Sequence, residues 1–409
     1  MISANKNNIF LSCCLLTGLV YLCADIYIPS ISGLALLLDC SINQIQQGIA
    51  LLMLGLSLSQ LIYGPLSEGY GRKHTLLTGL SICLVGALIS YASIFIKNIH
   101  LFYFGQLLEG LGLGSTALFR AMLRDSFEGH NLRNKSNFIS MFTSISAPLT
   151  QMIGGFLEVY TGTKSVFFVL NLIIVIILIH NLYTVPETNP QANINKVNTQ
   201  YIIDIYKLIM KHSLFRGYCF CTLLTYCSYF AIMLIIPVFA TNHLNWREDM
   251  VGLAMLINGG AGMVSGGLVN KALCYRYDTN TIMKVGWTIM TIAATYLLIH
   301  DLFFPTSASV AFGVMAVFLF GTCFLYANYF IKAFEPFNES AGYASSLFAC
   351  AQIFGSVIAA FVSGLLPESN LIPLSLLLLI CTIITWLYHE IIILPRTQPF
   401  IDKLDSQND

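Results

Sequence analysis

Long apolar stretches recur along the whole chain, and they restrict its possible folds more than any other feature. Runs of about 18 to 25 mostly apolar residues, each long enough to cross the hydrocarbon core of a bilayer as a helix, alternate with short polar links. Only 10% of the 409 residues are charged and 56% are hydrophobic, whereas soluble domains carry about 25% charged residues. Because backbone groups in lipid must be paired internally, these runs are predicted to be helices of an all-α integral membrane protein.

The spacing of the runs predicts twelve transmembrane helices in two groups of six. The longest polar stretch, 186–213, contains two prolines and an Asn/Gln-rich segment, followed by a helical pattern from Tyr201 typical of an interfacial helix. We therefore expect an N-terminal six-helix bundle (1–185), a cytoplasmic linker (186–213), a C-terminal six-helix bundle (214–396) and a cytoplasmic tail (397–409), with pseudo-symmetric bundles. The predicted spans are 9–29, 45–65, 75–96, 100–120, 136–157, 165–185, 215–240, 249–270, 281–300, 306–330, 341–366 and 371–394.

The basic residues predict the orientation. If the N-terminus is cytoplasmic, 17 of the 20 Lys and Arg residues fall on the cytoplasmic side, and only Lys97, Lys164 and Arg247 fall outside (20 − 3 = 17). The excess of Lys and Arg on the inner side predicts that both termini are cytoplasmic. The formal net charge is zero, which gives no indication of a nucleic-acid partner.

The link between the second and third runs reads GPLSEGYGRK over residues 64–73. Glycines allow a tight turn, and the two cations mark a cytoplasmic loop. The string resembles the loop signature of the major facilitator superfamily, G-x-L-x-D-x-x-G-R-K/R, with Glu68 in the place of the family Asp. The preceding QLIY (60–63) resembles the drug:proton antiporter branch that includes the bicyclomycin-resistance (Bcr/CflA) transporters.

The resemblance implies a gate at the cytoplasmic surface. The end of the fourth span, RAMLRD (120–125), is similar to the R-A-x-x-R-D of the same family. The family pattern pairs Glu68, Arg72 and Asp125 as a latch that holds the outward-open state; the alternative is a solvated cluster at the cytoplasmic surface. The implied gate residues are Gly64, Glu68, Gly71, Arg72, Lys73, Arg120, Arg124 and Asp125.

Asp25 lies at the end of the first run, in DIYIP (25–29). A carboxylate within a span is costly and is a functional hypothesis by default. The segment looks like the D-x-Y-x-P of the Bcr/CflA branch, which implies that Asp25, with Tyr27, serves protonation or cation binding. The alternative is a hydrated residue near the outer interface that helps to end the helix before Pro29.

Glu109 is the second acid within a span, in QLLEGLGLG (106–114). The family reads R-x-x-Q/H-G here, so Gln106 takes the place of the family Arg and Glu109 that of its Gln. The two side chains share a helix face, and we expect Glu109 to line the cavity instead of the missing group. The hypothesis is that Asp25 is the main coupling acid and that Glu109 binds substrate or tunes the proton step.

The fifth span carries Pro148, Gly154 and Gly155, which match part of the family's antiporter signature and favour export over import. The second half is poorer in charge, and its amides and tyrosines either line a pocket for an amphipathic ligand or serve ordinary packing. These residues are Asn258, Asn328, Gln352, Tyr226, Tyr229, Tyr326 and Tyr329.

The resemblance implies a proton-coupled secondary transporter that exports small amphipathic compounds or drugs across a bacterial inner membrane by alternating access. Its expected partners are a small-molecule substrate, protons and the lipid bilayer, and it is expected to be monomeric. We expect neither a cofactor nor a metal, since the twelve cysteines show no metal-binding spacing, and no enzymatic motif is present. The alternatives are an uptake symporter or uniporter of the same fold, and a receptor.

Overall fold

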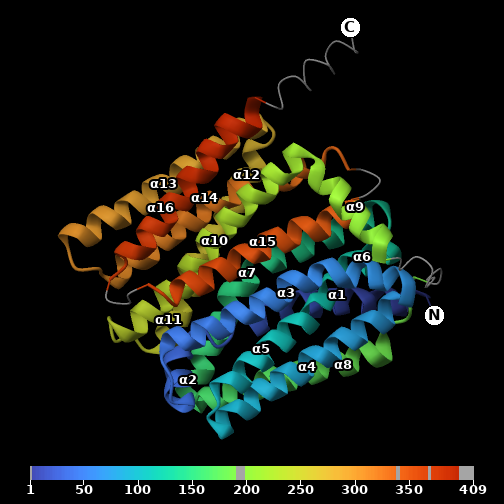
Figure 1. Cartoon of the computed structure of the whole chain (residues 1–409), viewed down its shortest axis with the longest axis horizontal. Coiled ribbons are helices and arrows are strands. Elements are labelled where there is room, and N and C mark those ends of the chain that lie inside the picture. The colour runs from blue at the N-terminus through green and yellow to red at the C-terminus, as the bar shows by residue number, and fades with distance from the viewer. Residues whose placement is uncertain (1, 190–198, 338–340, 367–369, 396–409) are drawn as a thin grey trace.

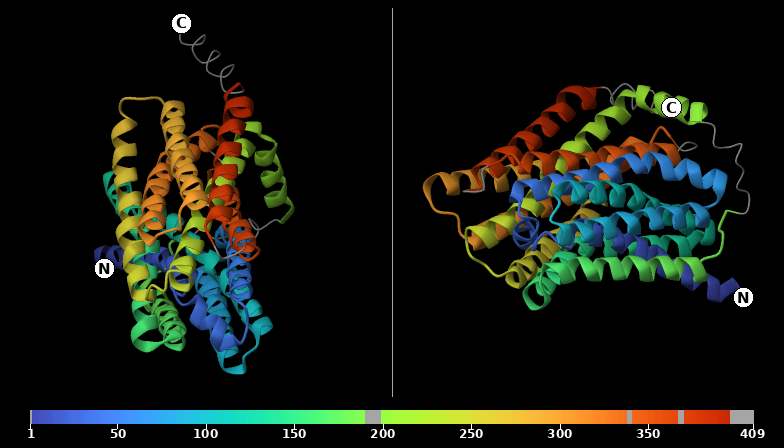
Figure 2. Two further views of the ribbon diagram at one scale, coloured as in Figure 1. Left: turned by 90° about the vertical axis from the view of Figure 1, so that its left-hand side faces the viewer. Right: turned by 60° about the horizontal axis from the view of Figure 1, so that its bottom comes forward.

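The computed structural model describes residues 2–189, 199–337, 341–366 and 370–395. Throughout these ranges the chain is helical and forms no strand. The axes of the long helices are roughly aligned, so that most of their connections gather at two opposite ends of the molecule (Figure 1, Figure 2). This is the all-helical architecture that the apolar runs predict.

The helices divide into two sets along the chain. The first set is α1 (Ile2–Asp25), α2 (Ile31–Leu38), α3 (Ile42–Tyr70), α4 (Arg72–Ile96), α5 (Ile99–Leu113), the 3₁₀ helix η1 (Gly114–Leu118), α6 (Phe119–Ser126), α7 (Gly129–Thr161) and α8 (Thr163–Thr184). The second set is α9 (Thr199–Lys211), α10 (Ser213–Asn242), α11 (Glu248–Ala254), the π-helix η3 (Met255–Gly259), α12 (Gly260–Leu273), α13 (Thr279–Phe303), α14 (Ala308–Phe334), α15 (Ala341–Ser363), α16 (Ile372–Tyr388) and the π-helix η4 (His389–Ile393).

Local sequence explains several of the helix boundaries. Ser41 begins α3 with a capping box, in which its hydroxyl accepts a hydrogen bond from the Gln44 backbone N–H at 3.3 Å. Asn98 begins α5 by accepting from the backbone N–H of His100 and of Leu101. Gly71, with φ of 88°, separates α3 from α4 by one residue. A side chain is strained at that φ, so the turn requires glycine.

Ten helices within the described ranges are long and apolar enough to cross a membrane, and the chain is therefore a multi-pass membrane protein. The predicted spans at 100–120 and 136–157 have no counterpart among these ten helices. The first is divided among α5, η1 and α6, and the second lies within α7, which is not one of the ten. The prediction of twelve spans therefore remains a prediction.

Some predicted boundaries were wrong. The first helix ends at Asp25 and not at 29, and a turn leads into the separate short helix α2. The helix expected from Tyr201 is present as α9, and its interfacial position stays a prediction. The part of the linker at 190–198 and the tail at 397–409 lie outside the described residues.

Within each set the long helices pack on one another. In the first set α5 lies between α3 and α4, while α1 contacts α6, α7 and α8; in the second, α10 contacts α14, α15 and α16, and α13 contacts α14 and α16. Glycines allow the closest contacts: a Cβ on Gly110 would lie 2.0 Å from the Leu52 carbonyl oxygen, and one on Gly112 would lie 2.1 Å from the Cys83 nitrogen. The glycines of α5 thus allow it to pack closely against both α3 and α4.

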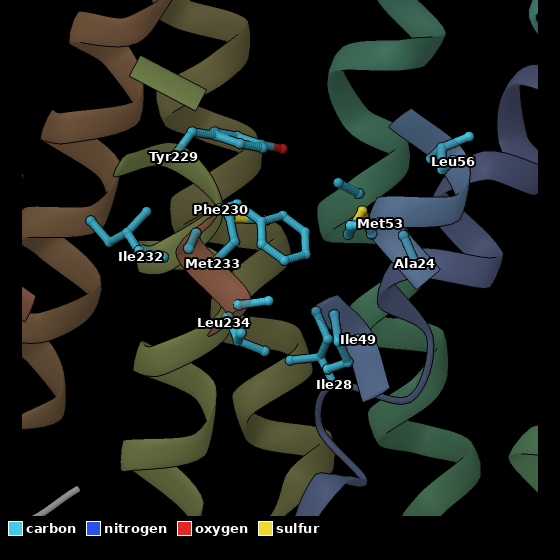
Figure 3. Close-up of a cluster of buried hydrophobic side chains, with 14 of the residues drawn as sticks. Ala24, Ile28, Ile49, Met53, Leu56, Tyr229, Phe230, Ile232, Met233 and Leu234 are labelled. Atoms are coloured by element: carbon cyan, nitrogen blue, oxygen red, sulfur yellow. The ribbon is translucent and has the colours of Figure 1, made fainter. Parts of the chain in front are cut away.

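The two sets meet through buried apolar side chains in the middle of the molecule. From the first set, α1, the turn after it and α3 contribute residues that face residues of α10 (Figure 3). The facing side chains are Ala24, Ile28, Ile49, Met53 and Leu56 on one side, and Phe230, Met233 and Leu234 on the other.

The longest contact between the sets is the α3–α15 seam, in which these two helices lie side by side (Figure 1). At one end, a Cβ on Gly364 would lie 3.1 Å from the Asn43 carbonyl oxygen, and at the other a Cβ on Gly64 would lie 3.4 Å from the Ser346 hydroxyl. Between them, the Ser57 hydroxyl donates to the Cys350 carbonyl at 2.9 Å. Small residues thus keep the two helices in contact along most of α3.

Candidate functional site

A central cavity of about 160 Å³ lies between the two sets of helices. Asp25 lines it from the C-terminal end of α1, and its residue is only 4% exposed. Among the described residues, Asp25 forms no ion pair. Asp25 is therefore not the hydrated interfacial residue of the alternative interpretation; it is a buried acid that faces a cavity.

The opposite wall of the central cavity is aromatic. Tyr226 and Tyr229, together with Phe230, line it from α10, and Gln352 lines it from α15. The Tyr226 ring lies 5.1 Å from that of Tyr229 and 5.7 Å from that of Tyr326, centroid to centroid. This wall matches the pocket interpretation of the tyrosines and amides. Asn258, Asn328, Tyr326 and Tyr329 are not among the residues that line the cavity.

A larger cavity of about 680 Å³, which we call the vestibule, lies at the end of the molecule where α3 turns into α4. Gln60, Ala117 and Arg120 line both cavities, so the vestibule adjoins the central cavity. The other vestibule residues come from both sets of helices and include Gly64, Glu68, Arg72, Arg124, Tyr201, Tyr343 and Ser346.

Arg120 lies where the two cavities meet, although the sequence placed it in the surface gate. The reason is η1: a 3₁₀ helix turns 120° per residue and an α-helix 100°, so the five residues Gly114–Leu118 rotate the following side chains by about 100°. Arg120 is exposed to the cavities, and it forms no ion pair with any residue that the structure describes.

The predicted latch residues come together around Arg72. Its guanidinium donates to Glu68 at 2.7 Å, to Asp125 at 3.2 Å and to the Ser67 hydroxyl at 2.5 Å, and its side chain is only 5% exposed. All of these groups lie in the first set of helices. The cluster is formed although the vestibule lies beside it. It therefore holds α3, α4 and α6 together and does not join the two sets.

Glu187 is a residue of this region that the sequence interpretation missed. Its carboxylate accepts hydrogen bonds from the backbone N–H of Arg72 at 2.8 Å and of Lys73 at 3.1 Å, at the N-terminus of α4. A carboxylate at a helix N-terminus pairs free N–H groups and the positive end of the helix dipole. A Cβ on Gly71 would lie 2.4 Å from a Glu187 carboxylate oxygen, so Gly71 also leaves room for this contact. In the sequence, Glu187 resembles an ordinary polar linker residue.

Glu109 is buried away from both cavities. Glu109 and Gln106 are 0% exposed, and neither lines a cavity. The Gln106 amide nitrogen approaches the Glu109 carboxyl at 3.3 Å and the Ser90 hydroxyl at 3.1 Å, and the Tyr27 hydroxyl donates to the Gln106 amide oxygen at 2.6 Å. The expectation that Glu109 lines the cavity is wrong for this conformation, because its helix face packs on Gly86 of α4.

The residues of the antiporter-like motif lie at contacts of α7, which is continuous through Pro148. Gly155 faces the Glu248 carbonyl of the second set, 2.2 Å from its would-be Cβ. Gly154 instead faces its own set: a Cβ there would lie 1.7 Å from the Ile26 carbonyl oxygen, directly after Asp25. Gly155 therefore packs against the second set, and Gly154 packs against its own set.

Comparison with known proteins agrees with this arrangement. Residues 13–360 match the family model described as Major Facilitator Superfamily. The chain is 24% identical over 345 residues to a bicyclomycin resistance protein homolog of Haemophilus influenzae (82% of this chain, 84% of the relative). It is 24% identical over 375 residues to multidrug resistance protein D of Escherichia coli (91% and 92%).

Solved structures show the same fold at low sequence identity. A D-xylose-proton symporter superposes with a TM-score of 0.73 at 15% identity, covering 93% of this chain and 97% of that one. The E. coli xylose transporter XylE, in a partially occluded inward-open conformation, superposes with a TM-score of 0.70 at 13% identity, with the same coverage.

Proposed function

The chain belongs to the Major Facilitator Superfamily, and we propose that it exports small amphipathic compounds across a bacterial inner membrane in exchange for protons. The observation that carries this proposal is Asp25, an acid without an ion-pair partner among the described residues, which faces a cavity walled by tyrosines. Such a carboxyl group can bind either a proton or a cationic substrate, so that one excludes the other. This competition is sufficient for exchange across a membrane.

The proposed transport cycle uses two six-helix halves that expose the central cavity alternately to each side of the membrane. With both termini in the cytoplasm, the vestibule lies on the cytoplasmic side, among Arg72, Arg120 and Arg124. At the other end the halves are held together: the Ser32 hydroxyl of α2 donates to Asn242 of α10 at 2.7 Å. The conformation therefore corresponds to an inward-facing state.

The names of the relatives support export of drugs, since both are resistance proteins. Uptake of a nutrient with protons is the second candidate, and Gln106 in the place of the family Arg favours it. The likeness to the xylose symporters concerns the fold alone. Both candidates use Asp25, so the direction of transport must be measured.

The test is a drug-susceptibility panel in a bacterial strain that lacks its own major efflux pumps. Expression of the chain should raise the inhibitory concentration of several amphipathic compounds relative to an empty vector, and a proton-gradient uncoupler should abolish their export from preloaded cells. An Asp25→Asn variant expressed at the same level is the matched control and should behave like the vector. Accumulation of the compounds on energisation would instead establish uptake.

A further inference from the structure

An acidic and a basic side chain face the central cavity, and neither has a counter-ion among the residues that the structure describes. The Asp25 carboxyl enters it from α1 and the Arg120 guanidinium from α6; in the described parts of the chain neither forms an ion pair, with the other or elsewhere. Tyr21, one helical turn before Asp25, lies within electrostatic range of both groups. Unpaired charges within a membrane protein are costly, so a bound molecule that pairs both would be favoured.

The approach to the cavity carries an excess of positive charge. In the vestibule, Arg72 and Glu68 pair with each other, whereas Arg120 and Arg124 form no ion pair among the described residues. A molecule that enters through the vestibule therefore meets guanidinium groups first. Positively charged clefts attract anions over long range, and the planar fork of Arg matches a carboxylate in two parallel hydrogen bonds.

The deeper part of the cavity has the opposite preference. Tyr226 and Tyr229 line it together with Asp25, and the Tyr326 ring packs against both tyrosines. Aromatic faces and a carboxylate both attract an ammonium group. A molecule that moves inwards from the vestibule thus passes an anion-binding group where the cavities meet, and then reaches a cavity lined by aromatic rings and a cation-binding group.

The central cavity is too small for a drug-sized ligand, so a ligand of that size must reach from one cavity to the other. Pockets for drug-sized molecules are about 300–1,000 Å³, and the central cavity holds only about 160 Å³. A ligand whose amine reaches Asp25 must therefore extend past Arg120 into the vestibule. Its outer end then lies beside the guanidinium.

We propose that the preferred substrates are aromatic zwitterions, bound with a carboxylate on Arg120 and a protonated amine at Asp25. This inference rests on the proposed function and narrows it to a substrate class. Arg120 is then a specificity-determining residue in direct contact with substrate, and not part of a surface gate.

The test measures binding to the purified full-length protein in lipid nanodiscs by isothermal titration calorimetry. The three probes are a piperazinyl quinolone carboxylic acid (the zwitterion), its methyl ester (the cation) and its N-acetyl derivative (the anion). The wild type should bind the zwitterion at least about tenfold more tightly than either derivative. Arg120→Gln should weaken the binding of the zwitterion and of the anion by about tenfold or more and leave the affinity for the cation unchanged. Asp25→Asn should weaken the binding of the zwitterion and of the cation and leave the affinity for the anion unchanged.

Each of these two variants contains its own folding control, because one probe should bind normally. Arg133→Gln, which alters an exposed Arg of α7 outside both cavities, should leave all three affinities unchanged. If the methyl ester binds the wild type as tightly as the zwitterion does, the inference is overturned while the proposed function stands. The same holds if Arg120→Gln leaves the affinity for the zwitterion unchanged. If the wild type binds none of the three probes, the inference is overturned; the proposed function fails only if the susceptibility panel also shows no export.

Discussion

Replacing Gly154 by alanine should destabilise the protein and weaken substrate binding together. The added Cβ would lie 1.7 Å from the Ile26 carbonyl oxygen, whereas a carbon–oxygen contact needs about 3.3 Å. Because the opposing atom belongs to the backbone, no side-chain rotation relieves the clash, and α7 must move away from the end of α1 by about 1.5 Å. Overpacking of this kind costs about 1–3 kcal/mol, and the higher helix propensity of alanine offsets at most about 1 kcal/mol.

The displacement acts on the residue next to Asp25, so it also moves the carboxyl group that lines the cavity. We expect the thermal unfolding midpoint in detergent to fall by several degrees and substrate affinity to fall by about tenfold, which corresponds to about 1.4 kcal/mol. The matched control is Gly313→Ala, a glycine within α14 whose added Cβ would have no neighbour within 4 Å. This control should be as stable as the wild type or more stable. Equal stability and equal affinity in the two variants would refute the reasoning.

Three further predictions concern proton coupling, the Arg72 cluster and topology. Asp25→Asn should abolish substrate-driven proton movement in proteoliposomes, whereas Glu109→Gln should leave it measurable, since only Asp25 faces the cavity; the reverse result would exchange their roles. Arg72→Ala should abolish transport but lower stability by no more than about 1–2 kcal/mol, because solvent reaches its carboxylate partners; normal transport by this variant would remove the cluster from the mechanism. In a cysteine-free background, a membrane-impermeant thiol reagent applied from outside should label Lys97→Cys and not Lys207→Cys; the opposite pattern would reverse the orientation.

The sequence was sufficient for the helical membrane fold because each span must bury its backbone polar groups within itself. The resemblance to the family also implied that Glu68, Arg72 and Asp125 come together, and the structure brings these groups together. Spacing alone indicates only the Glu68–Arg72 pair, which is i,i+4, because Asp125 lies 53 positions from Arg72. The conformation in which the cluster forms could not be obtained in the same way.

The positions of Arg120, Glu109 and Glu187 could not be predicted, for different reasons. Arg120 depends on the phase change at η1, which has no distinct sequence pattern in a glycine-rich helix. Glu109 lies on the helix face that packs against α4, and helix periodicity alone does not say which neighbour each face meets. Glu187 acts through a contact between residues 115 positions apart along the chain.

The α3–α15 seam limits how the molecule can open. Its small-residue contacts run from Asn43 to Gly64 on α3, and these 21 steps span about 30 Å, close to the thickness of the hydrocarbon core. A seam of this length can serve as the axis about which one group of helices rotates against the other. The displacement of any side chain in such a rotation grows with its distance from the axis. Side chains on the seam itself then remain almost stationary, while side chains far from the seam move furthest. Bulky substitutions along the seam would therefore disturb the axis of the rotation and not the helices that move furthest from it.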